Sequence, residues 1–182
     1  GNNCIRVITF GPTSAGGGNK RVVSTLAGSG RAGCTDGLAA AASFDKPSSV
    51  LALGSPRDLG DGESVVYVTD TANHCIRTIS AGITSRGSEL HVSTLCGKPG
   101  LAGHADGSFA ECLFSSPTGL SILPDGTLAI ADAGNNCVRR LAVEARIAST
   151  LAGSAERMWG LVDGPSADAR FNTPKGIGVS PT

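Results

Sequence analysis

The sequence predicts an all-β protein built from repeated units of four short antiparallel strands. The 182-residue chain contains 26 glycines, and aromatic residues make up only 4% of it. Such a composition is typical of short β-branched runs that are separated by many turns. Three sequence blocks also recur along the chain, and internal repeats of this kind mark supersecondary units that stack on one another. The repeats decide the architecture.

The first repeated block is an Asp-Gly pair followed at constant offsets by an Ala, a Phe and a Pro. It occurs three times, and the copies begin at Asp36, Asp106 and Asp163 and end at Pro47, Pro117 and Pro174. Asp-Gly is a turn pair, so we expect each copy to lie in the loop that joins one unit to the next. The longer copy carries insertions at 54–64 and 81–89, where we expect surface loops because added length there leaves the packing intact.

Two further blocks alternate with the first. Ser-Thr-Leu-x-Gly occurs at 24–28, 93–97 and 149–153, and Asn-x-Cys-Ile/Val-Arg occurs at 2–6, 73–77 and 135–139. In the two complete copies an Asp stands three residues before that Asn, at Asp70 and Asp132. Each unit therefore repeats the same order of turn and strand positions.

The more compact copy gives the clearest strand boundaries. Its apolar runs predict strands at 119–123, 127–132, 136–142 and 146–151, which are joined by tight turns. The longer copy predicts strands at 49–53, 64–70, 74–80 and 90–96. The strands are apolar on both faces, as is expected of units sandwiched between neighbours, and four antiparallel strands are the makeup of a β-propeller blade.

We therefore predict a β-propeller fragment with two complete blades and partial blades at both ends. The half blade is expected at 1–28, the complete blades at 47–97 and 117–153, and the start of the next blade at 174–182, with a strand at 176–179. An open arc would leave apolar blade faces in water, because each repeat buries its face against a neighbour. The chain is therefore expected to associate with more chain.

These blocks resemble the NHL repeat, which is named after an Asn-His-Leu signature. The signature positions read Asn-His-Cys at 73–75 and Asn-Asn-Cys at 2–4 and 135–137, and the surrounding pattern matches the family over nearly the whole chain. The resemblance implies a propeller of about six blades. It also implies an interaction domain for proteins and, in some members, RNA. Related six-bladed propellers include lactonases and the amidating lyase, which use a metal in the central channel.

Three polar positions recur in both complete copies, and we interpret them as structural. They are Asp70, Asn73 and Arg77 in the longer copy and Asp132, Asn135 and Arg139 in the compact copy. An Asp side chain can cap the backbone N–H groups of a tight turn, and an Asn tolerates the left-handed conformation there. Metal binding around a central channel is the alternative interpretation. Because a feature of every blade is expected to be scaffold, the sequence predicts no metal, no cofactor and no catalytic residue.

Five of the six cysteines occupy positions that are expected to be small and buried. Cys4, Cys75 and Cys137 share one strand position, and Cys96 and Cys112 align with alanines of the other copies. A buried free thiol behaves as a small hydrophobe, and equivalent cysteines of neighbouring blades are expected to lie too far apart to bridge. Cys34 lies in a Gly-rich loop and is the one candidate reactive thiol, with Arg31 as the sequence neighbour that could lower its pKa.

The side-chain types that differ between the repeated units are concentrated in the loops between blades, at 29–35, 98–105 and 154–162. These loops carry the candidate ligand-binding residues Arg31, Lys98, His104, Arg157 and Trp159. Exposed Trp and Arg side chains are common anchors of interfaces. For Trp159 the sequence supports a second role equally well, in which the indole covers the seam between two blades.

The sequence thus favours a non-catalytic scaffold that presents propeller loops to a ligand, with protein as the expected partner. The alternatives are part of a metal-dependent propeller enzyme whose active residues lie mostly in other blades, and a structural segment of a large multidomain protein. The chain has 15 basic and 15 acidic residues, and this neutral balance does not support an RNA partner. No apolar run approaches the roughly 18 residues of a membrane-spanning helix.

Overall fold

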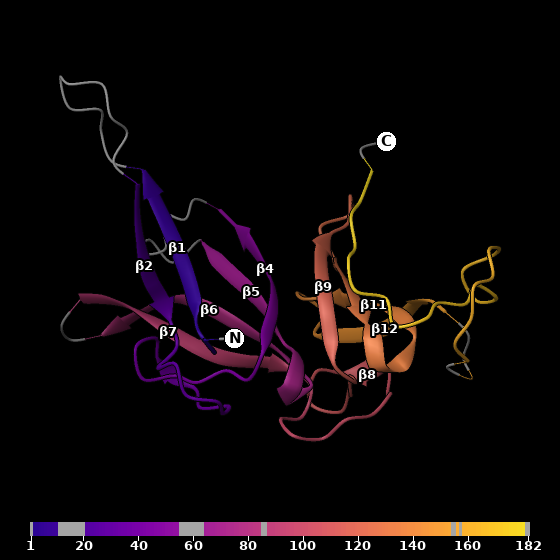
Figure 1. The fold of residues 1–182 in the computed structure, drawn as a ribbon, viewed down its shortest axis with the longest axis horizontal. Coiled ribbons are helices and arrows are strands. Elements are labelled where there is room, and N and C mark those ends of the chain that lie inside the picture. Colours follow the sequence, from indigo (N-terminus) through magenta and orange to yellow (C-terminus); the bar gives the residue numbers. More distant parts are fainter. Residues whose placement is uncertain are drawn as a thin grey trace.

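The structure is a computed structural model that describes residues 2–10, 21–54, 64–84, 87–153, 156 and 158–180. Its strands form three antiparallel sheets, of which the first two lie in the left half of Figure 1 and the third in the right half. The first is a hairpin of β1 (Ile5–Phe10) and β2 (Arg21–Ala27). The all-β class and the β-propeller type of architecture predicted from the repeats are confirmed.

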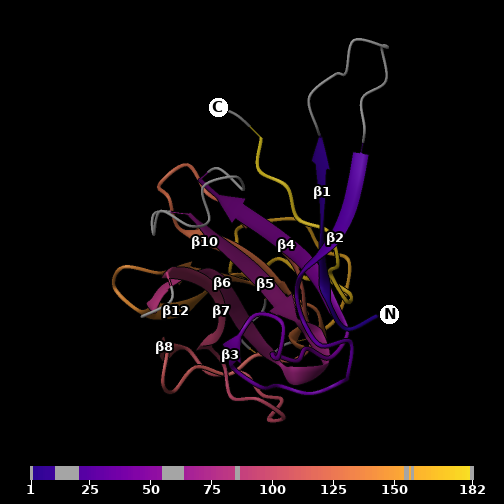
Figure 2. The ribbon, with the colours of Figure 1, turned by 90° about the vertical axis from the view of Figure 1, so that its left-hand side faces the viewer.

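The second sheet has the strand order β3-β7-β6-β5-β4. Its strands are β3 (Gly37–Leu38), β4 (Pro47–Leu53), β5 (Val65–Asp70), β6 (Cys75–Thr84) and β7 (Gly87–Cys96). A three-residue 3-10 turn, η1 (Thr71–Asn73), joins β5 to β6. Figure 2 shows β4, β5 and β6 following one another across this sheet.

The third sheet repeats the second, with the order β8-β12-β11-β10-β9. Its strands are β8 (Gly107–Ser108), β9 (Pro117–Ile122), β10 (Leu128–Asp132), β11 (Cys137–Ala142) and β12 (Ile147–Ala152). The turn η2 (Ala133–Asn135) takes the place of η1. Neither of these one-turn helices is long or apolar enough to cross a membrane.

Each complete sheet has a fifth strand that the sequence did not predict. β3 pairs with β7 through Gly37 and Leu38, and β8 pairs with β12 through Gly107 and Ser108. Both belong to the Asp-Gly block that was assigned to the loop between blades. A two-residue strand is too short for a period-2 pattern, so no alternation in the sequence could indicate it.

Two other strand predictions need correction. The insertion at 81–89 was expected to be a surface loop, but 81–84 and 87–89 continue the ladder between β6 and β7, because Ala81 pairs with Leu90 and Gly82 with Glu89. No strand forms at 176–179, since this segment makes no ladder with the described residues. The other insertion, 54–64, lies mostly outside the described residues.

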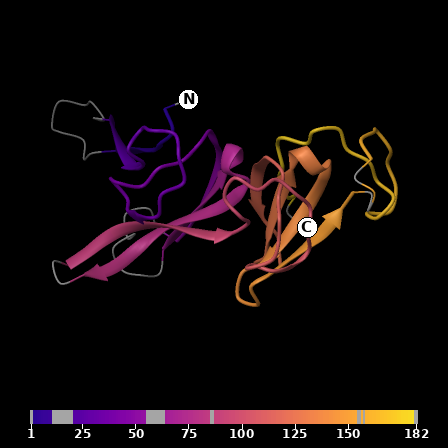
Figure 3. The same cartoon turned by 90° about the horizontal axis from the view of Figure 1, so that it is seen from below.

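Two apolar clusters fill the seams between neighbouring sheets, which are seen from below in Figure 3. One joins the N-terminal hairpin to the second sheet and is centred on Phe44, Val68 and Ile79. The other joins the second sheet to the third, and its members are Tyr67, Ile76, Cys96, Phe109, Cys112, Phe114, Leu120, Leu128, Ile130, Leu141 and Ala148. Burial of this apolar area in the seams is the main force that holds the sheets together.

Candidate functional site

A buried arginine joins the three repeated blocks within the second sheet. Arg77 on β6 donates hydrogen bonds to Asp70 Oδ2 at 2.8 Å and to Asp36 Oδ1 at 2.5 Å. Its guanidinium also donates to two backbone carbonyls and lies 5.2 Å from the centroid of the Phe44 ring. Because its side chain is completely buried, these charge-assisted bonds replace the hydration that the cation has lost.

The third sheet contains the same arrangement at the aligned positions. Arg139 donates to Asp132 Oδ2 at 3.1 Å and to Asp106 Oδ1 at 2.7 Å, and it lies 4.9 Å from the centroid of the Phe114 ring. The recurrence of the whole set in both sheets explains why the Asp-Gly, Phe and Asn-x-Cys-x-Arg blocks keep fixed offsets. It supports the interpretation of these residues as scaffold.

The aspartates cap backbone N–H groups, as predicted, but these belong to the bends at 45–46 and 115–116 and not to the turns that follow the aspartates. Asp70 makes no side-chain cap to η1. Its Oδ1 accepts a hydrogen bond from the backbone N–H of Asp45 at 2.7 Å, and its Oδ2 accepts one from Asn73 at 2.8 Å in addition to Arg77. Asp132 is held in the same way by Ser115, Asn135 and Arg139. Burial raises the pKa of both carboxyl groups, although these hydrogen bonds oppose the shift.

We expected Asn73 and Asn135 to adopt the left-handed conformation of each turn. Instead, the residue that follows each of them does so. His74 has φ +58° and Asn136 has φ +53°. Their side chains reach into the next unit, where His74 Nδ1 accepts from the backbone N–H of Ser116 at 2.9 Å and Asn136 Oδ1 accepts from that of Thr173 at 3.0 Å. Asn and His both occur at this position because each offers an acceptor at a similar reach.

Asn73 and Asn135 fix the loops between units above the arginine network. The Asn73 amide donates to the carbonyl of Gly33 at 2.8 Å, and the Asn135 amide donates to the carbonyl of Gly103 at 2.8 Å. The loops 29–35 and 98–105 lie below the strands in Figure 1, on the side of the sheets where η1 and η2 are located. The two networks thus supply a rigid base for these two loops.

Four of the five predicted ligand-binding residues lie in the described part of the three loops between units. Arg31 and Lys98 are exposed, and Trp159 has 71% of its surface exposed. His104 is half-buried, with its Nε2 3.2 Å from Thr150 Oγ1 on β12. Arg157 lies outside the described residues.

Alignment of the three loops identifies two exposed positions at their tips. One position, five residues before each Asp-Gly pair, holds Arg31, Leu101 and Met158, and the next holds Ala32, Ala102 and Trp159. All six residues are exposed. Sequence reasoning missed Leu101 and Met158, although their common offset with Arg31 from the Asp-Gly pair was a usable signal. We name the six residues the loop tips.

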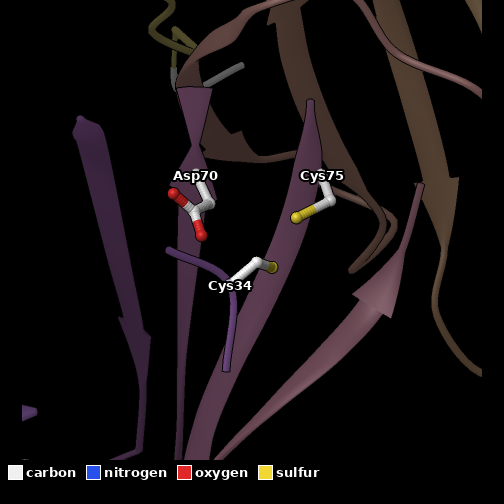
Figure 4. A group of neighbouring side chains, drawn as sticks. All are labelled: Cys34, Asp70 and Cys75. Atoms are coloured by element: carbon white, nitrogen blue, oxygen red, sulfur yellow. The ribbon is translucent and has the colours of Figure 1, made fainter. Parts of the chain in front are cut away.

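A cysteine pair lies beside the arginine network of the second sheet. The Sγ atoms of Cys34 and Cys75 and a carboxylate oxygen of Asp70 are all within 4.8 Å of one another (Figure 4). Arg77 Nη1 donates a hydrogen bond to Cys34 Sγ at 3.2 Å. A divalent metal fits this group poorly, because the guanidinium cation is adjacent and both Asp70 oxygens already accept hydrogen bonds.

Comparison with known families decides the type of repeat. Residues 114–141 match the family model of the NHL repeat. The chain contains an NHL repeat. The matched segment runs from Phe114, which packs under Arg139, to Leu141 on β11. The NHL repeat therefore includes the buried arginine, its Asp132 partner and the turn between them.

Curated and solved proteins resemble longer stretches of the chain. It is 35% identical over 107 residues to the Arabidopsis thaliana protein SUPPRESSOR OF QUENCHING 1, chloroplastic, a match that covers 59% of this chain and 9% of the relative. A Bacteroides thetaiotaomicron protein of unknown function is 28% identical with a TM-score of 0.53, over 65% of this chain and 28% of that one. An auxiliary nutrient binding protein from Bacteroides ovatus is 22% identical with a TM-score of 0.56, over 72% and 32% of the two chains. The chain thus spans a small part of the curated relative.

Proposed function

We propose that this chain is a non-catalytic binding module that holds a protein partner on its loop tips. The exposure of Arg31 and Leu101, whose loops lie against complete sheets, carries the proposal, and Trp159 belongs with them by alignment. The aligned residues Ala32 and Ala102 are also exposed, although their loops lie against complete sheets. A position that stays at the surface in every copy is not one that covers a seam, so this argues against the alternative role of the indole.

The chemistry of the loop tips and of the loop residues beside them suits a partner with apolar and acidic groups. Leu101 is 50% exposed, and Met158 and Trp159 add further apolar surface. Arg31 and Lys98 contribute positive charge at two of the loops. Aromatic and arginine side chains on a supported surface are typical of residues that dominate binding energy.

The other function classes have less support. RNA binding draws much of its affinity from a surplus of basic residues, and the chain has 15 basic against 15 acidic residues. A metal-dependent enzyme would need a set of ligands, and the group of Cys34, Asp70 and Cys75 is the one such set in the described part of the chain. The adjacent Arg77 makes that set a poor cation site.

Site-specific photo-crosslinking tests the proposal and captures the partner whatever its identity. A photoreactive amino acid would be placed at Leu101, or as a matched control at Ala145, which is exposed on the β11–β12 turn at the opposite side of the sheet. Irradiation of cells that express the full-length protein should give a discrete protein adduct from position 101 and none from position 145. When the protein with the photoreactive residue at position 101 also carries Trp159→Ser, the yield of the adduct should fall. The reason is that positions 101 and 159 are proposed to contact the same partner.

Two results would contradict the proposal. One is an equal yield of adducts from both positions, which indicates non-specific contact. The other is an adduct from position 101 that persists unchanged in the Trp159→Ser protein. An adduct that is lost on treatment with ribonuclease would identify RNA as the partner class instead.

A further inference from the structure

We propose that Cys34 is a peroxide-reactive thiol and that Cys75 is its resolving thiol, so that peroxide converts the pair into a disulfide. This modification site is separate from the loop tips. It joins a residue of the variable loop after β2 to the first residue of β6. From the sequence alone, Cys34 had no expected thiol partner and Cys75 was expected to be a buried, unreactive thiol.

The two sulfur atoms are near enough to react. They lie within 4.8 Å of each other, and Figure 4 shows the Cys75 sulfur directed toward Cys34. An S–S bond is about 2.05 Å long, so one of the side chains must move closer. The carbonyls of Gly33 and Thr35, on either side of Cys34, are held by Asn73 and Arg77, so this movement comes from rotation of the cysteine side chains about their Cα–Cβ bonds.

The surroundings of Cys34 favour the thiolate, which is the reactive form of a cysteine. A hydrogen bond from the Cys75 thiol is the main cause that lowers the pKa of Cys34 to about 7, and the positive charge of Arg77 assists. Partial burial and the negative charge of Asp70 oppose this shift. The same hydrogen bond, together with burial, raises the pKa of Cys75, so the proton of the pair resides on Cys75.

The Cys34 and Cys75 thiols differ in their exposure to solvent. Cys34 is partly exposed to solvent, whereas Cys75 is completely buried. Peroxide can therefore reach Cys34 and not Cys75. The roles of first and second thiol follow from this difference in access and from the location of the proton.

The reaction balances with hydrogen peroxide as the oxidant. The Cys34 thiolate attacks one peroxide oxygen, the O–O bond breaks, and the departing hydroxide takes up a proton to give water and Cys34 sulfenic acid. The Cys75 sulfur then attacks Cys34 Sγ, the S–O bond breaks, and the departing hydroxide leaves as water with the Cys75 proton. Two thiols are oxidised to one disulfide, and one peroxide is reduced to two waters. The first step also removes the Cys34 thiolate that raises the pKa of Cys75.

A second cysteine pair in the same chain serves as an internal comparison. Cys96 and Cys112 also share a hydrogen bond, which lowers the pKa of Cys112 to about 7. Both residues are buried in the seam between the second and third sheets. If access governs the reaction, this pair stays reduced in the folded protein despite the lowered pKa.

The third sheet cannot form the equivalent disulfide. The position of Cys34, two residues before the Asp-Gly pair, is occupied by His104 in that copy, while Cys137 occupies the position of Cys75. The proposed site is therefore specific to one of the two complete repeats.

Peptide mapping of the full-length protein after peroxide treatment tests the proposal. The protein would be reduced, freed of reductant, treated with hydrogen peroxide, alkylated, digested with trypsin without reduction and analysed by mass spectrometry. Arg57 lies between the two cysteines in sequence, so trypsin separates them unless a disulfide holds the peptides together. We expect a linked Cys34–Cys75 peptide that forms at least about tenfold faster than any Cys96–Cys112 link.

Two variants test the assigned roles. Cys75→Ser should leave a sulfenic acid on Cys34 that dimedone labels, because no thiol remains to resolve it. Cys34→Ser should leave Cys75 reduced. The proposal is overturned if wild-type Cys34 is inert, if it becomes sulfinic acid without a linked peptide, or if the Cys96–Cys112 link forms as fast as the Cys34–Cys75 link.

Discussion

At the residue scale, neighbouring arginines of β11 have opposite environments. Arg139 is completely buried and joins Asp132 to Asp106, whereas Arg140 forms an ion pair with Asp125 in which the side chains are 41% and 50% exposed. A buried charge that loses its partner cannot recover its hydration, but an exposed one can. Two residues of the same type, adjacent in sequence, should therefore differ sharply in their contribution to stability.

We predict that Arg139→Leu lowers the free energy of unfolding by about 3–5 kcal/mol, because it leaves Asp132 buried without its cation. The matched change Arg140→Leu should cost less than about 1 kcal/mol. Urea unfolding followed by circular dichroism measures both values. Equal losses from the two variants would show that the buried network does not stabilise the fold.

The pH dependence of Cys34 alkylation tests the charge assignment around this thiol. Iodoacetamide reacts with the thiolate, so the rate should rise with pH and reach half of its maximum at a pH of about 7. The groups that face Cys34 are Cys75 and Arg77 from β6 and Asp70 from β5. A half-maximal rate at about pH 8.5, the value of an unperturbed thiol, would contradict the assignment.

At the element scale, a repeated glycine ends the last long strand of each unit. Gly97 follows β7 with φ +85°, and a Cβ added there would lie 2.8 Å from the carbonyl oxygen of His74 and 2.9 Å from Cys75 Cα. Gly28 and Gly153 make the same close approach to Cys4 and Cys137. This explains why the Ser-Thr-Leu-x-Gly block ends in glycine in all three copies.

We predict that Gly97→Ala is more destabilising than Gly100→Ala, although both glycines have positive φ. Gly100 has φ +78°, and a Cβ added there would lie in open space, so alanine should cost about 1–2 kcal/mol from backbone strain alone. Gly97→Ala should cost a further 1–3 kcal/mol or so from the overlap with the β6 backbone. Thermal unfolding of the two variants measures the difference, and equal losses would exclude the steric explanation.

Elements whose signal repeats along the chain could be predicted from sequence. β4, β5, β9, β10 and β11 begin and end near their predicted positions, since apolar patterning and turn residues mark them. β3 and β8 could not be predicted, because a strand of two residues is too short to show the alternation of apolar and polar residues. The proximity of Cys34 to Cys75 was also hidden, since it depends on a contact between Asp36 and Arg77 across 41 residues of sequence.

The candidate site was predictable in part for the same reason. Loops of variable chemistry between constant blocks indicated Arg31, Lys98 and Trp159, all of which are exposed. The contact of His104 with Thr150 could not be predicted, because it depends on the pairing of β8, just after its loop, with β12, which no local pattern shows.

At the scale of the whole molecule, the sheets are held together by apolar seams and by one recurring polar link. Asn3, His74 and Asn136 each accept a hydrogen bond from a backbone N–H of the next unit, at Lys46, Ser116 and Thr173. The seams supply most of the free energy of association, because they bury apolar area. The hydrogen bond between units is directional, so it fixes the position of one unit relative to the next.

We predict that His74→Ala destabilises the protein by about 1–3 kcal/mol, because the N–H of Ser116 loses its acceptor. His74→Asn should keep the free energy of unfolding within about 1 kcal/mol of the wild-type value, since asparagine makes the same link in the other two copies. Chemical unfolding of the two variants provides the comparison. A loss from His74→Asn as large as that from His74→Ala would contradict the acceptor role.

We propose that successive NHL-type units leave their loop tips accessible to a partner. An experimental structure of the full-length protein tests this claim most directly through the surroundings of Trp159. We expect the indole to lie in solvent or against a partner, at the same height as Ala32 and Ala102 above the arginine networks. An indole buried in a seam between two blades of the same chain would contradict the account.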